Sequence, residues 1–242
     1  VYYLDEDANE VAYALQLCRE RKPLGVLFLG GDLEFFQAEF QHISVPCVLL
    51  TSSAQGLPFP NLSSLTTDDE EAACQVVRYL AGRGHRHIGL LGGNRSCTQI
   101  SYRRVLGFQR ALDQLGLPFD PRRCEPSRYS MPDAYDSTRR LLARCPELTA
   151  LFCVSDLMAI AAIRAIRDLG RRVPEDISVV GYDGIPLGRF SVPRLTTVRQ
   201  NTQRLAERGV ELLLGSLQQR RPPVHDVVPF QLIPGESVAR LG

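Results

Sequence analysis

Lysine is almost missing from this chain. Lys22 is the only one, so nearly all of the basic residues are arginines, which we attribute to genome composition rather than to function. An excess of one charge is also missing, because the formal net charge is only +1. The net charge therefore gives no indication that the chain binds nucleic acid or an anionic membrane. No apolar run approaches the roughly 18 residues of a membrane span, and no signal peptide opens the chain, so we expect no membrane segment.

The sequence also lacks the short motifs of common enzymes. It contains no G-x-S-x-G, H-E-x-x-H or P-loop. No G-x-G-x-x-G opens the helix that follows the glycines of 89–93, so a dinucleotide site is not expected. His85 and His87 have no third metal ligand nearby, and we expect His85 to cap a helix end. The sequence therefore predicts no enzyme, no cofactor and no metal.

The cysteines do not form a disulfide or zinc pattern. The seven of them are odd in number and include no C-x-x-C pair. Several lie in apolar runs, as Cys153 does within 151–154. Buried free thiols in a reducing cytoplasm fit this usage better than disulfides or zinc, so we expect a cytoplasmic protein.

The 242 residues, 44% of them hydrophobic, are enough for one large or two ordinary domains. Short apolar strands alternate with helical patterns, which predicts doubly wound α/β units with parallel sheets. We interpret 1–4 as the end of a strand and 55–64 as irregular. The acids of 68–71 start a long helix, match its dipole and are expected to be solvated. We also expect the chain to cross between two units at these residues.

One stretch indicates where a ligand could bind. Residues 177–180 are apolar and β-branched, as in a strand buried on both faces. Asp183 follows that strand, and ligands of open parallel sheets bind beyond the carboxyl ends of the strands. The alternative for Asp183 is a turn residue that caps its own backbone.

Five segments together carry a family resemblance. They are YLAGRGHRHIGLLGG (79–93), RVLGF (104–108), SDLMA (155–159), PEDISVVGYD (174–183) and PRLTTVRQ (193–200). In order and spacing the chain resembles the effector-binding core of the lactose-repressor/galactose-repressor family of bacterial transcription regulators. The resemblance covers nearly the whole chain.

The resemblance implies two Rossmann-like lobes with three crossovers, as in periplasmic sugar-binding proteins. Residues 1–67 with 201–228 would form the N-terminal lobe, and 68–200 with 229–242 the C-terminal lobe. Family members carry a helix-turn-helix headpiece for operator DNA and a hinge helix before this core. We expect both of these, and the first strand and helix of the first lobe, to be missing here, which would expose a strand edge.

The resemblance also implies an effector in the cleft between the lobes and a twofold homodimer. The positions that match the family's effector contacts are Thr51, Ser52, Thr98, Arg104, Tyr129, Ser155, Asp156, Asp183 and Gln200. Several have plainer alternatives. Arg103 is the rival of Arg104 in register, Tyr129 could be a surface tyrosine, and Asp156 could cap the next helix. Many family members have Asn near the position of Ser155.

Two functions therefore remain open at this point. The first is a regulator core that senses a small metabolite, a sugar or sugar phosphate, although purine-type effectors are also known in the family. The second is a solute-binding protein of a transporter with the same fold. The free cysteines, the lack of an export signal and the quoted segments favour the regulator.

Overall fold

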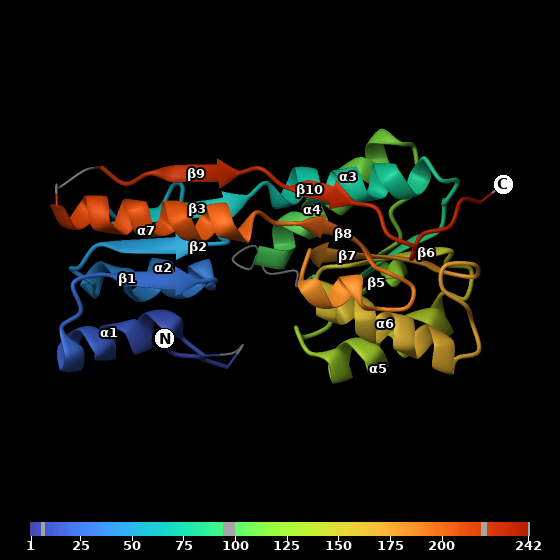
Figure 1. The fold of residues 1–242 in the computed structure, drawn as a ribbon, viewed down its shortest axis with the longest axis horizontal. Helices are drawn as coiled ribbons and strands as arrows, with labels where there is room; N and C mark the ends of the chain where they lie inside the picture. Colours follow the sequence, from blue (N-terminus) through green and yellow to red (C-terminus); the bar gives the residue numbers. More distant parts are fainter. Residues whose placement is uncertain (6–7, 94–99, 219–221, 242) are drawn as a thin grey trace. The chain divides into compact units, whose positions relative to one another are not determined.

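The computed structural model describes residues 1–5, 8–93, 100–218 and 222–241. The chain divides into two compact units and crosses between them after Asp68, Gln200 and Pro229. Unit 1 holds Val1–Asp68 and Asn201–Pro229, and unit 2 holds most of 69–200 together with Phe230–Gly242. Each unit is a sheet covered by helices (Figure 1). The predicted α/β class with parallel sheets is confirmed.

Unit 1 is built on a four-stranded parallel sheet in the order β1-β2-β3-β9. Its elements are α1 (Glu10–Arg21), β1 (Val26–Leu29), α2 (Leu33–Glu39), η1 (Phe40–His42), β2 (Cys47–Leu50), β3 (Leu62–Thr67), α7 (Thr202–Gln218) and β9 (His225–Val228). β1 lies at the edge, and among the described strands it pairs with β2 alone. Residues 1–5 are exposed and have no regular structure, so the strand predicted at 1–4 is wrong.

Two apolar cores cover the faces of this sheet. On one face, Phe36 and Phe40 pack with Phe28 and with Val11 of α1. On the other face, Leu205 of α7 packs with apolar residues of β2, β3 and β9. The side chains of β2 are buried along its whole length because helices cover both faces.

β3 was missed in the sequence, where 55–64 was interpreted as irregular. Its residues Ser63 and Ser64 are polar but buried. The Ser64 hydroxyl accepts a hydrogen bond from the Ala54 amide at 2.9 Å and lies 2.8 Å from His225 Nδ1. Ser63 Oγ accepts from the Val224 amide at 3.1 Å. Long-range hydrogen bonds therefore satisfy a strand whose sequence does not show the apolar pattern.

Unit 2 contains a six-stranded sheet in the order β10-β8-β7-β6-β4-β5, parallel except for β10. Its elements are α3 (Asp69–Ala81), β4 (Ile88–Leu91), α4 (Ile100–Gln114), η2 (Pro121–Arg123), β5 (Cys124–Glu125), α5 (Met131–Arg144), β6 (Ala150–Cys153), α6 (Asp156–Asp168), β7 (Ser178–Asp183), η3 (Pro186–Arg189), β8 (Thr196–Arg199) and β10 (Gln231–Ile233). β9 and β10 follow one another in the chain but belong to different sheets.

The helices α3 and α4 pack closely at Gly107. A Cβ at this position would overlap the backbone oxygen of Glu70 and would lie 2.8 Å from its carbonyl carbon. It would also lie 2.9 Å from Ala73 Cβ. The missing side chain lets the two backbones approach, and Arg104, one turn earlier on α4, comes beside the first turn of α3.

The segment after β10 is fastened to unit 2 by buried polar contacts. The Ser237 hydroxyl accepts from the Thr196 amide at 2.8 Å and donates to the Val179 carbonyl at 2.6 Å. His85 is fully buried, with Nδ1 3.0 Å from Thr149 Oγ1 and Nε2 3.3 Å from the Ala239 carbonyl. His85 was predicted to cap a helix end, and its amide does donate to the Leu80 carbonyl at the end of α3 at 3.2 Å, while its side chain holds the segment after β10.

Two further expectations concern cysteines and the membrane. The six described cysteines are free, and four of them are buried. Cys97 lies outside the described residues. Within the described ranges, no helix is long and apolar enough to cross a bilayer.

Candidate functional site

Arg104 is the centre of the polar cluster at the carboxyl edge of the sheet in unit 2. Its side chain is only 4% exposed. Nε donates to Asp69 Oδ1 at 2.8 Å, and Nη1 donates to the Val154 carbonyl just past the end of β6. The guanidinium carbon lies 3.6 Å from the centroid of the Tyr182 ring, a cation–π contact with β7. Arg103 instead is 67% exposed and lies 3.7 Å from Glu70, so Arg104 is the arginine that faces the sheet.

Asp69 and Tyr182 were not recognised as site residues in the sequence. Asp69 was grouped with an acid run expected to be solvated, but its side chain is 6% exposed. The Tyr182 hydroxyl donates to the same Asp69 oxygen at 2.7 Å. Burial alone would lower the pKa of Arg104, but the electrostatic effects of Asp69, Tyr182, Tyr129 and Asp183 together outweigh it and raise that pKa. The arginine is therefore held charged in a buried place by the groups around it, Asp69 foremost.

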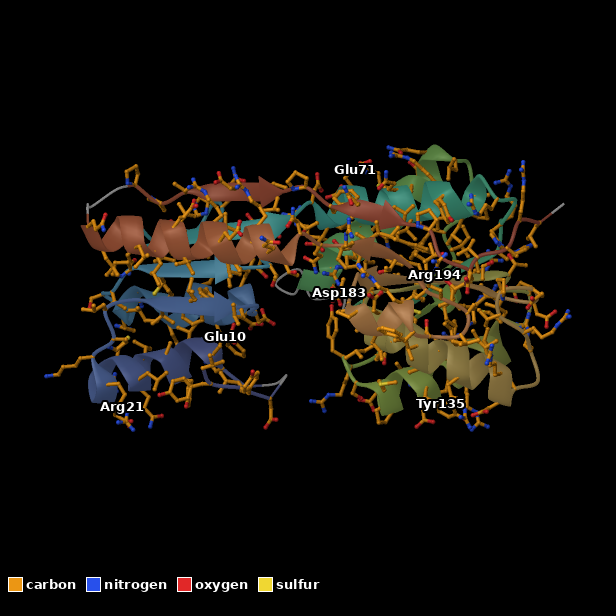
Figure 2. The ribbon with its side chains drawn as sticks, in the orientation of Figure 1. Glu10, Arg21, Glu71, Tyr135, Asp183 and Arg194 are labelled. Carbon is orange, nitrogen blue, oxygen red and sulfur yellow. The ribbon has the colours of Figure 1, made fainter. Side chains whose placement is uncertain are left out.

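Asp183 lies at the carboxyl end of β7 (Figure 2). Its φ of 112° is a backbone conformation that residues other than glycine rarely adopt. Gln200 fixes it twice, through Nε2 to Oδ1 at 2.8 Å and through its amide to the Asp183 carbonyl at 3.1 Å. Burial raises the pKa of Asp183, while Arg104 and the Gln200 hydrogen bond oppose that rise. Arg104 and Asp183 are thus near enough for their charges to interact.

Tyr129 belongs to the same cluster. Its side chain is 42% exposed, yet the environment of its hydroxyl is crowded enough to raise the pKa of the phenol. The charge of Arg104 and a hydrogen bond with Ser101 oppose that rise, whereas Asp183 and Asp69 add to it. A tyrosine with an exposed ring and an enclosed hydroxyl can present its face to a ligand. Its environment therefore differs from that of an ordinary surface tyrosine.

Ser155 and Asp156 begin α6 directly after β6. The Ser155 hydroxyl caps the helix by accepting from the Met158 amide at 3.3 Å. Asp156 is fully buried, and its carboxylate accepts from Thr197 Oγ1 and from the Ile185 amide at 2.8 Å. It therefore ties α6 to β8 and to the segment that follows Asp183. Burial raises the pKa of Asp156 to about 7, against the effect of these hydrogen bonds.

The remaining predicted contacts lie elsewhere. Thr51 and Ser52 follow β2 in unit 1, and Thr98 lies outside the described residues. Thr51 has a φ of 70°, which is costly for a β-branched residue. Ser52 is 6% exposed, and among the described residues its hydroxyl is the buried side-chain polar atom that has no hydrogen-bond partner. Strain and an unsatisfied hydroxyl therefore coincide at the end of this strand.

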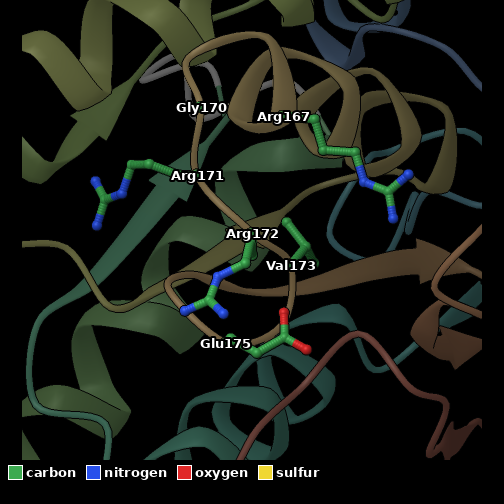
Figure 3. A pocket seen from close by; sticks show the side chains of 6 residues that line it. All are labelled: Arg167, Gly170, Arg171, Arg172, Val173 and Glu175. Atoms are coloured by element: carbon green, nitrogen blue, oxygen red, sulfur yellow. The ribbon is translucent and has the colours of Figure 1, made fainter.

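A surface pocket of about 410 Å³ lies at the other end of unit 2, before β7 begins. It is lined by Arg167, Gly170, Arg171, Arg172, Val173 and Glu175. Figure 3 shows the side chains of Arg167 and Arg171 extending in opposite directions. Arg172 is already paired with Asp176 at 2.9 Å. The arginines do not converge, and the pocket adjoins the amino end of β7 rather than the edge where such sheets bind ligands.

Comparison with known proteins bears on this site. The model of the periplasmic binding protein-like domain family matches residues 77–238. A solved structure described as a complex of the transcriptional regulator CelR with cellobiose is 29% identical, with a TM-score of 0.83, and the match covers 94% of this chain and 70% of that one. The chain therefore has the fold of a periplasmic-binding-protein-like domain.

Two curated relatives define the group more narrowly. The HTH-type transcriptional regulator MalR of Clostridium butyricum is 32% identical over 234 residues, which are 95% of this chain and 69% of the relative. The HTH-type transcriptional repressor PurR of Aliivibrio salmonicida is 31% identical over 239 residues, or 97% and 68%. The chain belongs to the lactose-repressor (LacI) family of transcriptional regulators and is an effector-binding core of that family, not a transporter's solute-binding protein.

Proposed function

We propose that this core senses a small hydroxyl-bearing metabolite, a sugar, which binds at the carboxyl edge of the sheet in unit 2. Arg104 and Asp183 would supply the main hydrogen bonds, and the Tyr129 ring would lie against the apolar face of the sugar. Ser155 and Gln200, which belong to unit 2, would complete the contacts at this edge. Asp156 would not contact the effector itself but would position Asp183 by holding the segment that follows it, through the Ile185 amide. Binding would regulate transcription without catalysing a reaction.

One observation carries this proposal: the buried guanidinium of Arg104 and the half-buried carboxylate of Asp183 lie together at the strand ends. Among the described residues, Arg104 donates through Nε to Asp69 and through Nη1 to the Val154 carbonyl, and Nη2 would donate to a hydroxyl of the sugar. The side-chain oxygens of Asp183 would accept hydrogen bonds from the hydroxyls. The unfavourable φ of Asp183 supports the same conclusion, because backbone strain is kept at functional sites. The relative solved with cellobiose adds support for a sugar.

The test is a thermal-shift screen with cellobiose, maltose, ribose and hypoxanthine, followed by calorimetry of the compound that binds. We expect Asp183→Ala and Arg104→Ala each to weaken that binding at least 30-fold, since a hydrogen bond to a charged group contributes about 2 kcal/mol. Arg103→Ala is the matched control and should leave affinity unchanged, because Arg103 is exposed. Normal binding by both site variants would show that the effector site lies elsewhere.

We propose that two copies of the chain pair through an apolar patch on unit 2. The patch comprises Leu157 at 39% exposure, Leu187 at 47%, Phe190 at 81% and Val192 at 72%. Asp156 anchors the loop of Leu187 and Phe190 to the start of α6, which carries Leu157. Isologous contact of such a patch gives a twofold dimer.

The similarity to HTH-type regulators supports two further parts of the proposal. The protein would contact operator DNA through an N-terminal headpiece, and it would act in the cytoplasm.

Charging this patch should separate the copies. We expect Phe190→Asp with Val192→Asp to raise the dimer dissociation constant at least 100-fold, because two exposed apolar anchors become buried carboxylates. Sedimentation velocity at micromolar concentration measures the change. Phe119→Asp, at an apolar position of similar type on another surface with 40% exposure, should leave the dimer intact. A wild-type chain that stays monomeric, or a double variant that still pairs, would contradict the assignment.

A further inference from the structure

The charge of Arg104 is already compensated inside the protein. The Asp69 carboxylate lies 2.8 Å from Nε, with both side chains almost fully buried. Opposite charges at that distance attract far more strongly in a buried site than at the surface. The pair presents little net positive charge, although the guanidinium keeps its hydrogen-bond donors.

The neighbouring arginines do not restore that positive charge. Arg103 lies 3.7 Å from Glu70. Arg110 pairs with Glu70 at 2.5 Å and with Glu71 at 2.8 Å. The described groups named as acting electrostatically on Arg104 are the carboxylates Asp69 and Asp183 and the phenols Tyr182 and Tyr129, and none of the four carries a positive charge. The cluster around Arg104 is therefore neutral or negative in total.

We propose that Asp69 determines which charge the effector can have, so that the site accepts an uncharged hydroxyl-bearing molecule and rejects its phosphorylated or carboxylated counterpart. This inference rests on the proposed function and narrows the class of effector. A phosphate group would lose its hydration and would meet Asp69 and Asp183 as well as Arg104, without a net attraction to offset that loss. A neutral hydroxyl needs only the donors of Arg104 and the acceptors of Asp183.

Asp69 also positions Arg104 for this task. Its Oδ1 accepts from both Arg104 Nε and the Tyr182 hydroxyl, which orients the guanidinium plane against the Tyr182 ring. Gly107 permits the approach of α4 to α3 on which the pair depends. Asp69 is thus a positioning residue, and its effect on charge selection is separable from an effect on folding.

The experiment is a titration with inorganic phosphate, monitored by the ¹H–¹⁵N signal of Arg104 Nε–H, which Arg104→Lys identifies by its loss. We expect no phosphate-dependent shift in the wild-type chain up to tens of millimolar. Asp69→Asn should bind phosphate at least 10-fold more tightly at this signal, because the guanidinium is then uncompensated. Glu71→Gln is the matched control: it removes one charge from the same helical turn, at 42% exposure, and should behave as wild type.

Two results would overturn the inference. One is a wild-type chain whose Arg104 signal already responds to phosphate, and this arm decides the matter even if Asp69→Asn proves too unstable to study. The other is a folded Asp69→Asn variant with no gain in phosphate binding. A chain that binds no neutral sugar but shows the predicted gain in Asp69→Asn would instead refute the proposed function and leave the charge assignment standing.

Discussion

Gly107→Ala should destabilise unit 2 by about 3 kcal/mol or more, because overpacking against atoms that cannot move lies at the upper end of such substitutions. The added Cβ would overlap the backbone of Glu70 and would lie 2.9 Å from Ala73 Cβ. Neither is the flexible end of a side chain, so α4 must move away from α3. The Arg104 to Asp69 contact would lengthen with it, and effector binding should weaken in the folded fraction.

The control for this substitution lies in unit 1. Gly215 is also inside a helix, and a Cβ there would have no neighbour within 4 Å. Gly215→Ala should therefore be neutral or stabilise by about 0.5–1 kcal/mol, since alanine is the better helix former. Urea denaturation of both variants, followed by circular dichroism, measures the difference. A Gly107→Ala variant as stable as the wild type would show that the two helices are not in close contact.

Asp156→Asn should remove a pH dependence of stability between about pH 4 and pH 7. The pKa of Asp156 is raised from 3.8 to about 7 in the folded chain, chiefly because burial disfavours the charged form. The folded state therefore holds the proton more tightly than the unfolded state does. The protonated Asp156 side chain therefore contributes up to roughly 4 kcal/mol to the free energy of unfolding. This contribution is fully present below pH 3.8 and is lost as the pH rises through about 7.

Asparagine suits the site because its carbonyl can accept from the Ile185 amide while its amide donates to Thr197 Oγ1. The measurement is the free energy of unfolding in urea at pH 5 and at pH 8. In the wild type this free energy should be lower at pH 8 than at pH 5, and in Asp156→Asn the difference between the two pH values should be smaller. Asp113→Asn, at an exposed carboxylate, should keep the wild-type slope. Equal slopes for wild type and Asp156→Asn would mean that Asp156 titrates as an ordinary carboxyl.

The sequence located the strand ends better than it assigned their side chains. Asp183 follows a strand that the apolar run of 177–180 predicts, and β7 covers Ser178–Asp183. Asp69 and Glu71 look alike in the sequence, yet one is buried and the other is 42% exposed. The spacing of residues along a helix tells which of them share a face. It does not tell which face is buried, because that depends on where the neighbouring helix packs. The same limit left Arg103 and Arg104 as alternatives.

The sequence by itself determined the α/β alternation, the free cysteines and the family, because these depend on local patterns and on motifs read in order. Only the tertiary structure decided that β3 is a strand, since two of the partners of its buried serines, His225 and Val224, lie 161 residues away in the chain. It alone decided that Asp69 compensates Arg104, 35 residues away. Burial and Coulombic pairing act through space, so no local pattern encodes them.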